Sequence, residues 1–273
     1  MAITLTERFA AGVDERFIKE SLSTPGINQN YSWEGAKTIK VTSVPTVPLG
    51  DYTRQGTTRF GTPTELQNEV QEMTLKQDKA FSFTLDKMNA EETQMKAAEA
   101  LGRQVREVIV PYVDKYRFTQ MASLAGGSAE AALDEKTVYK AVTTGTEYLD
   151  EHEIPDGRVI FVVPALINLL KNSDGYVKAS DLAQDRIVWK GMVAELDGMP
   201  VVSVPKKRMP DNLNFMIAHP SATVAPIKLA DYRLHEDPPG ISGTLAEGRI
   251  YFDAFVLNQK KNGIYVHKTP STP

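Results

Sequence analysis

The sequence contains no cysteine, and this absence excludes disulfide bridges, thiolate metal ligands and thiol nucleophiles. It also lacks an apolar run long enough to span a membrane. The residues after Met1 are polar and amphipathic, unlike the apolar segment of a secretory signal. We therefore expect a soluble chain with no export signal and no membrane partner.

An excess of charge of one sign is also missing. The 31 basic and 35 acidic residues leave a formal net charge of −4, so the chain as a whole has little attraction for phosphate backbones. If a nucleic acid is nearby, we therefore expect this chain to bind it weakly.

Residue patterns for catalysis and metal binding are sparse. Of the four histidines, only His152 lies between carboxylates, and adjacent helix residues point in different directions, so we favour a solvated helix end over a metal site. No Gly-x-Ser-x-Gly elbow is present, and Gly240 to Gly248 lacks the Gly-Lys-Ser/Thr ending of a phosphate loop. We predict no catalytic residue, no cofactor and no metal. An enzyme with an unrecognised site stays as an alternative.

The most informative stretch is a long amphipathic helix from Asn89 to about Leu124. Its apolar stripe recurs at steps of three or four residues, at Met95, Ala98, Leu101, Val105, Val108, Tyr112 and Tyr116. Asn89 and Glu92 suit a capping box, and Gly126-Gly127 follow its end. About 36 residues would span roughly 54 Å, which predicts a structural spine. Pro111 predicts a kink near Glu107 to Pro111.

The residues before this helix predict a short arm and an extended loop. Residues 4–22 have the period of an amphipathic helix, and Thr38 to Val44 alternate as a strand. Apolar residues around Val70 to Leu75 and Phe81 to Leu85 flank the polar Gln77 to Lys79, which predicts a hairpin between these two runs. Because a two-stranded ribbon is marginally stable alone, we expect a partner chain to support it.

The residues after the helix predict a compact mixed domain from about Ala132 to Ala218. Ala125 to Ala132 is small and flexible, and Asp134 caps an amphipathic helix. The apolar Val159 to Val163 is typical of a strand covered on both faces, and Pro164 opens a further helix. Asp197-Gly198 suits a type I′ hairpin turn.

The last fifty residues have the pattern of strands. The four predicted strands are Thr223 to Ile227, Tyr232 to His235, Ile250 to Leu257 and Gly263 to His267. A long helix cannot bury its stripe alone, so we expect these strands and the spine to form one α+β layer.

Several of these segments together resemble the major capsid proteins of tailed phages with the Hong Kong 97 fold. The run Glu72 to Thr93 is similar to the extended loop that enters the family's spine helix, and Val110 to Arg117 resembles the end of that helix. Gly191 to Val204, Ala218 to Ala222 and Arg249 to Val256 are similar to later segments of the family. The resemblance covers nearly the whole chain from Trp33, and the order of the segments makes it specific.

The resemblance implies an α+β fold of the Hong Kong 97 type. Its parts would be an N-terminal arm (1–50), an extended β-hairpin loop (51–88), a spine helix with the start of the peripheral domain (89–131), a mixed axial domain (132–218) and C-terminal peripheral strands (219–273). Many family members begin with a long cleaved scaffolding segment. Here only a short arm precedes Trp33, which implies a separate scaffolding protein or an already short coat chain.

The function implied is a major capsid protein that self-assembles into the icosahedral shell around the double-stranded DNA genome of a tailed phage. Its partners would be itself, as hexamers and pentamers, with a scaffolding protein, a portal, a decoration protein and packaged DNA. It would be made in the bacterial cytoplasm and reside in the virion capsid. The alternative within the structural class is an encapsulin-like nanocompartment shell.

Residues predicted to contact neighbouring subunits come from the loop and from a basic turn between two prolines. They are Tyr52, Arg54, Arg59, Lys76, Asp78, Lys79, Lys206, Lys207 and Arg208. Some family members crosslink a loop lysine to an asparagine, and Lys76 or Lys79 with Asn258 or Asn262 would be the candidates; we favour solvated side chains. We also expect that deleting Arg54 to Lys79 leaves a folded subunit that cannot close a shell.

Overall fold

The structure is a computed structural model that describes residues 21–28, 38–43, 46–63, 65–66, 68–87, 97–173 and 192–270. It divides into two compact units, which we call the hairpin unit (Gly35–Leu75) and the core unit (Met1–Glu34 with Lys76–Pro273). Most of the predicted helix 4–22, the cap at Asn89 and Glu92, and Met95 lie outside the described residues. No described helix has both the length and the apolar content of a membrane span.

The spine is a nearly continuous helix from Ala97 to Ser123, with α3 (Ala97–Gln104), a π-helical turn η2 (Val105–Ile109) and α4 (Val110–Ser123) in succession. The π turn ends at Ile109, and the N–H of the next residue, Val110, donates to the carbonyl of Val105, five residues back. Pro111 cannot donate, and its ring would clash with the carbonyl four residues earlier, so a wider turn before it relieves the conflict. The π turn overlaps the region of the predicted kink, Glu107 to Pro111, and the kink itself stays a prediction.

The π turn also corrects the predicted stripe. Val108 is 50% exposed and Tyr112 is 45% exposed, although both were assigned to the buried face. A turn with one extra residue advances the buried face by one position, so Ile109 and Val113 take their places. Leu101 and Val105, which precede the extra residue, are buried as predicted.

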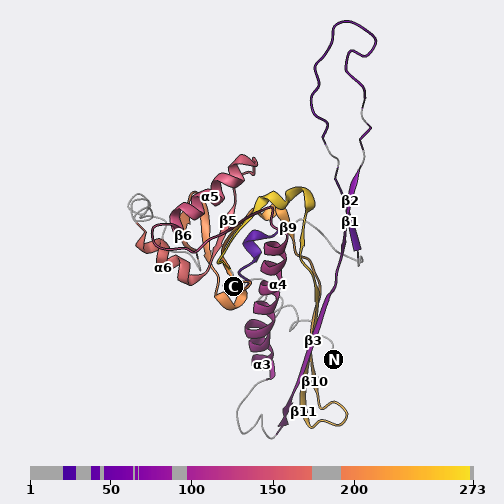
Figure 1. The fold of residues 1–273 in the computed structure, drawn as a ribbon. Coiled ribbons are helices and arrows are strands. Elements are labelled where there is room, and N and C mark those ends of the chain that lie inside the picture. The colour runs from indigo at the N-terminus through magenta and orange to yellow at the C-terminus, as the bar shows by residue number, and fades with distance from the viewer. Residues whose placement is uncertain are drawn as a thin grey trace. The chain divides into compact units, whose positions relative to one another are not determined.

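The spine packs on one face of a three-stranded antiparallel sheet (Figure 1), ordered β10 (Ile227–Glu236), β11 (Gly243–Phe252), β3 (Gln77–Asp86). The shared core includes Leu101, Val105, Val113, Tyr232 and Phe252. The predicted layer of spine and late strands is thus confirmed for β10 and β11.

The predicted hairpin between the runs at 70–75 and 81–85 is wrong. The first run lies in β2 (Glu69–Thr74), which pairs antiparallel with β1 (Thr38–Ser43) as a separate two-stranded sheet. The second lies in β3, which pairs with β11. The polar residues taken for a turn instead begin β3, where Gln77 pairs with Phe252. Alternation indicated the strands, but it carries no information about their partners.

The second core surrounds a six-stranded mixed sheet of the core unit. Its order is β4 (Gly127–Glu130), β13 (Ile264–Lys268), β8 (Leu213–Ala218), β5 (Val159–Val162), β7 (Met199–Ser203), β6 (Met192–Leu196). Helices α5 (Val138–Glu151) and α6 (Pro164–Asn172) contribute Val138, Val142 and Leu166 to this core. The buried strand at 159, the helix opened by Pro164 and the Asp197-Gly198 turn, with φ of 50° and 71°, are confirmed.

Two late predictions need correction. Gly263 to His267 was assigned to the spine layer, but β13 joins the six-stranded sheet between β4 and β8. Residues 127–130, predicted to be flexible, form β4, which pairs in parallel with β13. Gly126 suits close approach, because a Cβ there would lie 2.4 Å from the Asn262 side-chain oxygen.

Short elements complete the described chain. They are the 3-10 turns η1 (Thr24–Gly26), η4 (Lys206–Arg208), η5 (Pro220–Ala222) and η6 (Asn258–Gly263), and the short paired strands β9 (Thr223–Val224) and β12 (Phe255–Val256).

Candidate functional site

The hairpin unit carries most of the large exposed apolar side chains among the described residues. Six of the large exposed apolar side chains lie between residues 47 and 70: Val47, Leu49, Tyr52, Phe60, Leu66 and Val70. Three others, Val108, Tyr112 and Leu124, belong to the core unit. Exposed apolar side chains concentrated in one short segment are typical of a protein contact surface.

The tip of this segment is locally ordered around an aromatic pair. The rings of Tyr52 and Phe60 lie edge to face with centroids 5.0 Å apart, while Phe60 is 91% exposed. The N–H of Thr53 donates to the carbonyl of Arg59 at 3.1 Å, and the Arg59 side chain donates to the carbonyl of Gly56. Gly56 has a φ of 96°, which glycine adopts without strain. The tip therefore presents two aromatic rings beside arginine, a composition common at binding hot spots.

The predicted contact residues fall into two groups. Tyr52, Arg54 and Arg59 are exposed on the hairpin unit, and Lys206 and Lys207 are exposed on η4. The side chains of Asp78 and Arg208 instead pair within the chain, through Arg249 and Asp114.

The three basic residues of η4 thus differ in their surroundings. The Arg208 Nη1 atom donates to Asp114 Oδ2 at 3.0 Å, and the side chain of Asp114 is fully buried on α4. Lys206 and Lys207 remain available to solvent. The turn that sequence analysis treated as one basic run is therefore partly a structural anchor.

Asp114 is the centre of a buried polar cluster that joins three distant segments. Besides Arg208, it accepts hydrogen bonds from the Ser21 and Ser23 hydroxyls at 2.6 and 2.7 Å and from the Leu22 N–H at 3.1 Å. Arg117, one helical turn further along α4, donates to Ser23 at 3.1 Å. Burial lowers the pKa of Arg117 to about 10, an effect that Asp114 opposes. The cluster fastens residues 21–23 to the spine.

Asp78, Lys79 and Lys76 lie at the start of β3. Two side-chain nitrogens of Arg249 donate to the two carboxylate oxygens of Asp78, at 2.9 and 2.5 Å, and this hydrogen bonding lowers the pKa of Asp78. The Lys79 ammonium lies 5.9 Å from the centre of the Tyr112 ring, within cation–π range. Lys76 has an exposed side chain and a tethered backbone N–H.

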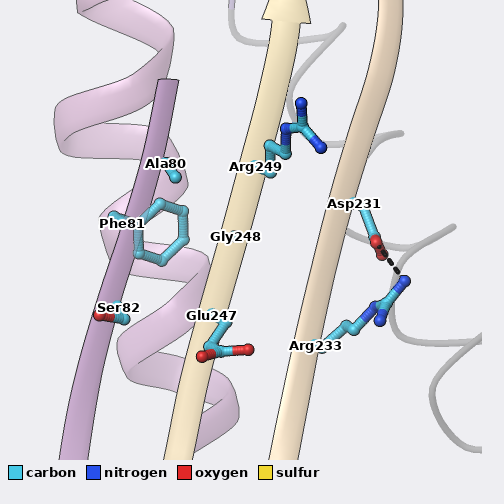
Figure 2. A pocket seen from close by; sticks show the side chains of 8 residues that line it. All are labelled: Ala80, Phe81, Ser82, Asp231, Arg233, Glu247, Gly248 and Arg249. Atoms are coloured by element: carbon cyan, nitrogen blue, oxygen red, sulfur yellow. Dashed lines mark ion pairs between the residues drawn. The ribbon is translucent and has the colours of Figure 1, made fainter. Parts of the chain in front are cut away.

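The outer face of the three-stranded sheet forms an open groove of about 550 Å³ (Figure 2). Its lining residues are Ala80, Phe81, Ser82, Asp231, Arg233, Glu247, Gly248 and Arg249. Opposite charges face each other across neighbouring strands at Asp231 with Arg249 and at Arg233 with Glu247. Asp231 is also bridged by Arg233 at 2.7 Å. Because these charges compensate one another, we assign no ligand to this groove.

The histidines serve separate local roles. His152 is exposed at the end of α5, where its Nδ1 lies 2.8 Å from the Tyr148 carbonyl, so the predicted solvated helix end is confirmed. His267 is buried and stacks on Phe215 at 5.1 Å, and burial lowers its pKa. His219 caps η5, and its pKa is lowered by burial. In the described part of the chain, no group of three or more histidine or carboxylate side chains could hold a metal ion.

Sequence reasoning missed the buried carboxylates Asp114 and Asp253. Asp114 is surrounded in sequence by the apolar Val110, Val113 and Phe118, and a charge within an apolar stripe was the available signal. That signal was concealed because the stripe predicted without the π turn, through Val108, Tyr112 and Tyr116, left Asp114 on the solvent face. Asp253 follows a strand end and carried no pattern of its own.

Comparison with known proteins finds similarity in structure alone. No protein-family model and no curated protein sequence matches the chain. A structure from Mycobacterium phage Che8 is similar, with a TM-score of 0.72 and 17% identity over 90% of this chain and 90% of that one. The mature capsid of bacteriophage PhiM1 gives a TM-score of 0.68 and 13% identity, over 88% and 84%.

A virus-like particle from Pyrococcus furiosus is similar over 97% of this chain and 99% of that one, with a TM-score of 0.60 and 9% identity. Identities this low establish the fold and nothing finer. The predicted fold class is confirmed: the chain is an α+β protein that shares the fold of phage capsid proteins over about nine tenths of its length.

Proposed function

We propose that the chain is a major capsid protein, the coat subunit of an icosahedral shell around the double-stranded DNA of a tailed phage. The observation that carries the proposal is the shared fold with phage capsid structures over most of both chains. On this proposal the protein acts by assembly and not by catalysis.

The exposed side chains of the hairpin unit support this role. Burial of the exposed side chains of Tyr52, Phe60 and Leu49 would stabilise the protein only if another surface covers them. A second copy of the chain is the partner that a shell supplies. Arg54 and Arg59 on the same segment, and Lys206 and Lys207 on η4, would add polar contacts at the rim. The subunits would form hexamers and pentamers that close into the shell.

Other partners follow from this role. We propose a separate scaffolding protein, a portal and a decoration protein, with the genome contacted non-specifically on the inner wall. The subunit would be made in the bacterial cytoplasm and reside in the virion. With a net charge of −4, isolated subunits should bind duplex DNA weakly at ~0.15 M salt, and submicromolar affinity in a fluorescence titration would contradict a passive wall.

The direct test is the assembly state of the purified protein. Sedimentation over a wide concentration range, with electron microscopy of each fraction, should show capsomer-sized oligomers or closed shells of megadalton mass. A protein that remains monomeric at every concentration would overturn the proposal.

A nanocompartment shell is the second candidate, because the virus-like particle from Pyrococcus furiosus covers nearly the whole of this chain. The content of particles recovered from cells separates the two functions. Nuclease-protected DNA of uniform length supports the phage capsid, whereas an enclosed protein without DNA supports the nanocompartment.

A further inference from the structure

The chain passes from the hairpin unit into the core unit between Leu75 and Lys76. The ladder between β3 and β11 ends at Gln77 paired with Phe252, so Lys76 lies one residue beyond the last backbone pair. Its N–H is nevertheless held, because it donates to Asp253 Oδ2 at 2.9 Å. A side chain thus extends the sheet by one step, up to the boundary between the units.

Asp253 is itself fixed to the spine. The Tyr116 hydroxyl of α4 donates to Asp253 Oδ1 at 2.7 Å, and the Ala254 N–H donates to the same oxygen at 2.8 Å. The carboxylate is only 3% exposed and accepts three hydrogen bonds. Burial and the bond to Asp253 raise the pKa of Tyr116, so its hydroxyl stays protonated and remains a donor at physiological pH.

The Tyr116 ring is also positioned by packing. It lies edge to face against Phe252, with centroids 5.5 Å apart and an interplanar angle of 86°. Phe252 is fully buried and is the last residue of β11. The spine, the end of β11 and the first residue after the hairpin unit therefore meet at one buried carboxylate.

We propose that Asp253 and Tyr116 are positioning residues for assembly: they fix the point at which the hairpin unit joins the core unit. This inference rests on the proposed function. The hairpin unit has two covalent connections to the core unit, one of them at Lys76, and contacts made by its exposed side chains act through these connections. We call the hydrogen bond from the Lys76 N–H to Asp253 the tether, and the place where the backbone is free to turn the pivot. With the tether, the pivot is set at residues 75 and 76. Without it, β3 can separate from β11 from Gln77 onward, and the pivot is no longer defined.

A defined pivot matters because association must order every freely moving part of the interface. An interface segment that is held at its base loses less conformational freedom when it binds than one that is loose there. The tether should therefore raise assembly at a given concentration without adding any contact to the interface itself.

The first test compares two tyrosines on the same helix. Tyr116→Phe removes the hydroxyl that binds Asp253 and keeps the ring against Phe252. Tyr112→Phe is the matched control, because Tyr112 also packs edge to face on Phe252, at 6.3 Å, and is 45% exposed. We expect Tyr116→Phe to speed hydrogen exchange at the Lys76 amide about tenfold and to raise the concentration needed for assembly several-fold. Tyr112→Phe should change neither.

The second test separates positioning from stability. Asp253→Asn keeps the size of the side chain but places an NH₂ group among three donors, so the Lys76 tether is lost. Ile217→Val, in the buried centre of the six-stranded sheet, lowers stability without touching the tether. The two variants are compared at temperatures chosen so that their free energies of unfolding are equal. Under these conditions the Asp253 variant should assemble several-fold less than the Ile217 variant.

The outcomes are distinct. If the wild-type protein never leaves the monomer, the proposed function fails. If the wild type assembles, and Tyr116→Phe assembles like Tyr112→Phe with unchanged exchange at Lys76, only the inference about the tether is overturned. Should Asp253→Asn fail to fold, the tyrosine pair alone decides.

Discussion

The sheet β10-β11-β3 and the hairpin β1-β2 are both antiparallel, yet they differ in how far their regions bury apolar side chains. In the three-stranded sheet, Tyr232 and Phe252 are buried against the spine, and the opposite face carries compensating charges. In the hairpin unit, Met73 and Leu75 are buried, whereas Leu49 and Phe60 are almost fully exposed. The first region buries its apolar side chains against the spine, whereas the exposed residues of the second need a surface from elsewhere.

If the chain assembles as proposed, this contrast separates folding from assembly. Substitutions in the spine and its sheet should alter the free energy of unfolding of the subunit. Substitutions at the tip of the hairpin unit should alter association and leave the subunit folded. Each prediction below tests which side of this division a residue belongs to.

The largest effect is expected for a charge in the spine core. Val113→Asp places an unpaired carboxylate at a position only 1% exposed, which costs several kcal/mol of about 5 to 15 available. We expect no folded protein. Val108→Asp, at a position 50% exposed, should fold with near wild-type melting. Circular dichroism during heating checks both variants, and similar losses in the two would contradict the shifted stripe.

The next effect concerns the hairpin unit. The deletion of Arg54 to Lys79 expected from sequence would remove the start of β3, so the structure favours a shorter one. Replacing residues 46–66 by a short turn keeps β1 and β2 paired. The subunit should retain its cooperative unfolding and lose assembly, as measured by calorimetry and sedimentation.

Tyr52→Ala with Phe60→Ala should weaken association about tenfold or more. Unchanged assembly would place the contact surface elsewhere.

A moderate effect is expected from pH. Burial lowers the pKa of His267 in the folded protein below its ordinary 6.5, so the unfolded chain takes up the proton first as pH falls. The stabilisation is complete above pH 6.5 and is lost as pH falls from there to the folded-state pKa. His267→Gln should flatten this dependence in urea unfolding at pH 7 and pH 5. A slope equal to that of the wild type would exclude His267.

The smallest effect is expected for the exposed pair between Asp78 and Arg249. Both side chains are substantially exposed, at 40% and 58%, so solvent screens their attraction. Asp78→Asn should move the melting temperature by less than about 2 °C. Because Asp253, near the same end of the sheet, is buried, Asp253→Asn should cause a clearly larger shift. Comparable shifts would mean that burial does not separate the two aspartates.

Local patterns predicted local structure well. Asp197-Gly198 specified its turn, because few residues adopt positive φ at both positions, and Pro164 marked a helix start because its missing N–H costs nothing there. Choice of partners was not accessible. The strands containing Val70 and Phe83 have the right period, but β2 and β3 pair with strands distant from each other.

The exposed part of the candidate site was accessible and the buried part was not. The exposure of Tyr52, Arg54 and Arg59 was predictable because they lie in a polar loop without a core of its own; their contact with a neighbouring subunit stays a prediction. Asp114 and Asp253 act through burial and through bonds to residues about 90 to 180 positions away, and no local pattern encodes such contacts. The π turn was a second reason why the buried residues were not predicted, because one extra residue rotates every later position of the spine.

The place of β13 in the six-stranded sheet has a consequence for synthesis on the ribosome. Among the described strands, β4 pairs only with β13, through Gly127 with Tyr265, so β4 waits for more than a hundred residues to emerge before it has this partner. Pairing at so long a sequence separation is slow, since loop closure precedes any gain from contacts. The core unit is therefore completed only after the hairpin unit has left the ribosome. Nascent chains thus expose the apolar side chains of the hairpin unit before the core unit is complete. If the chain assembles as proposed, crowded polysomes are where premature association would begin.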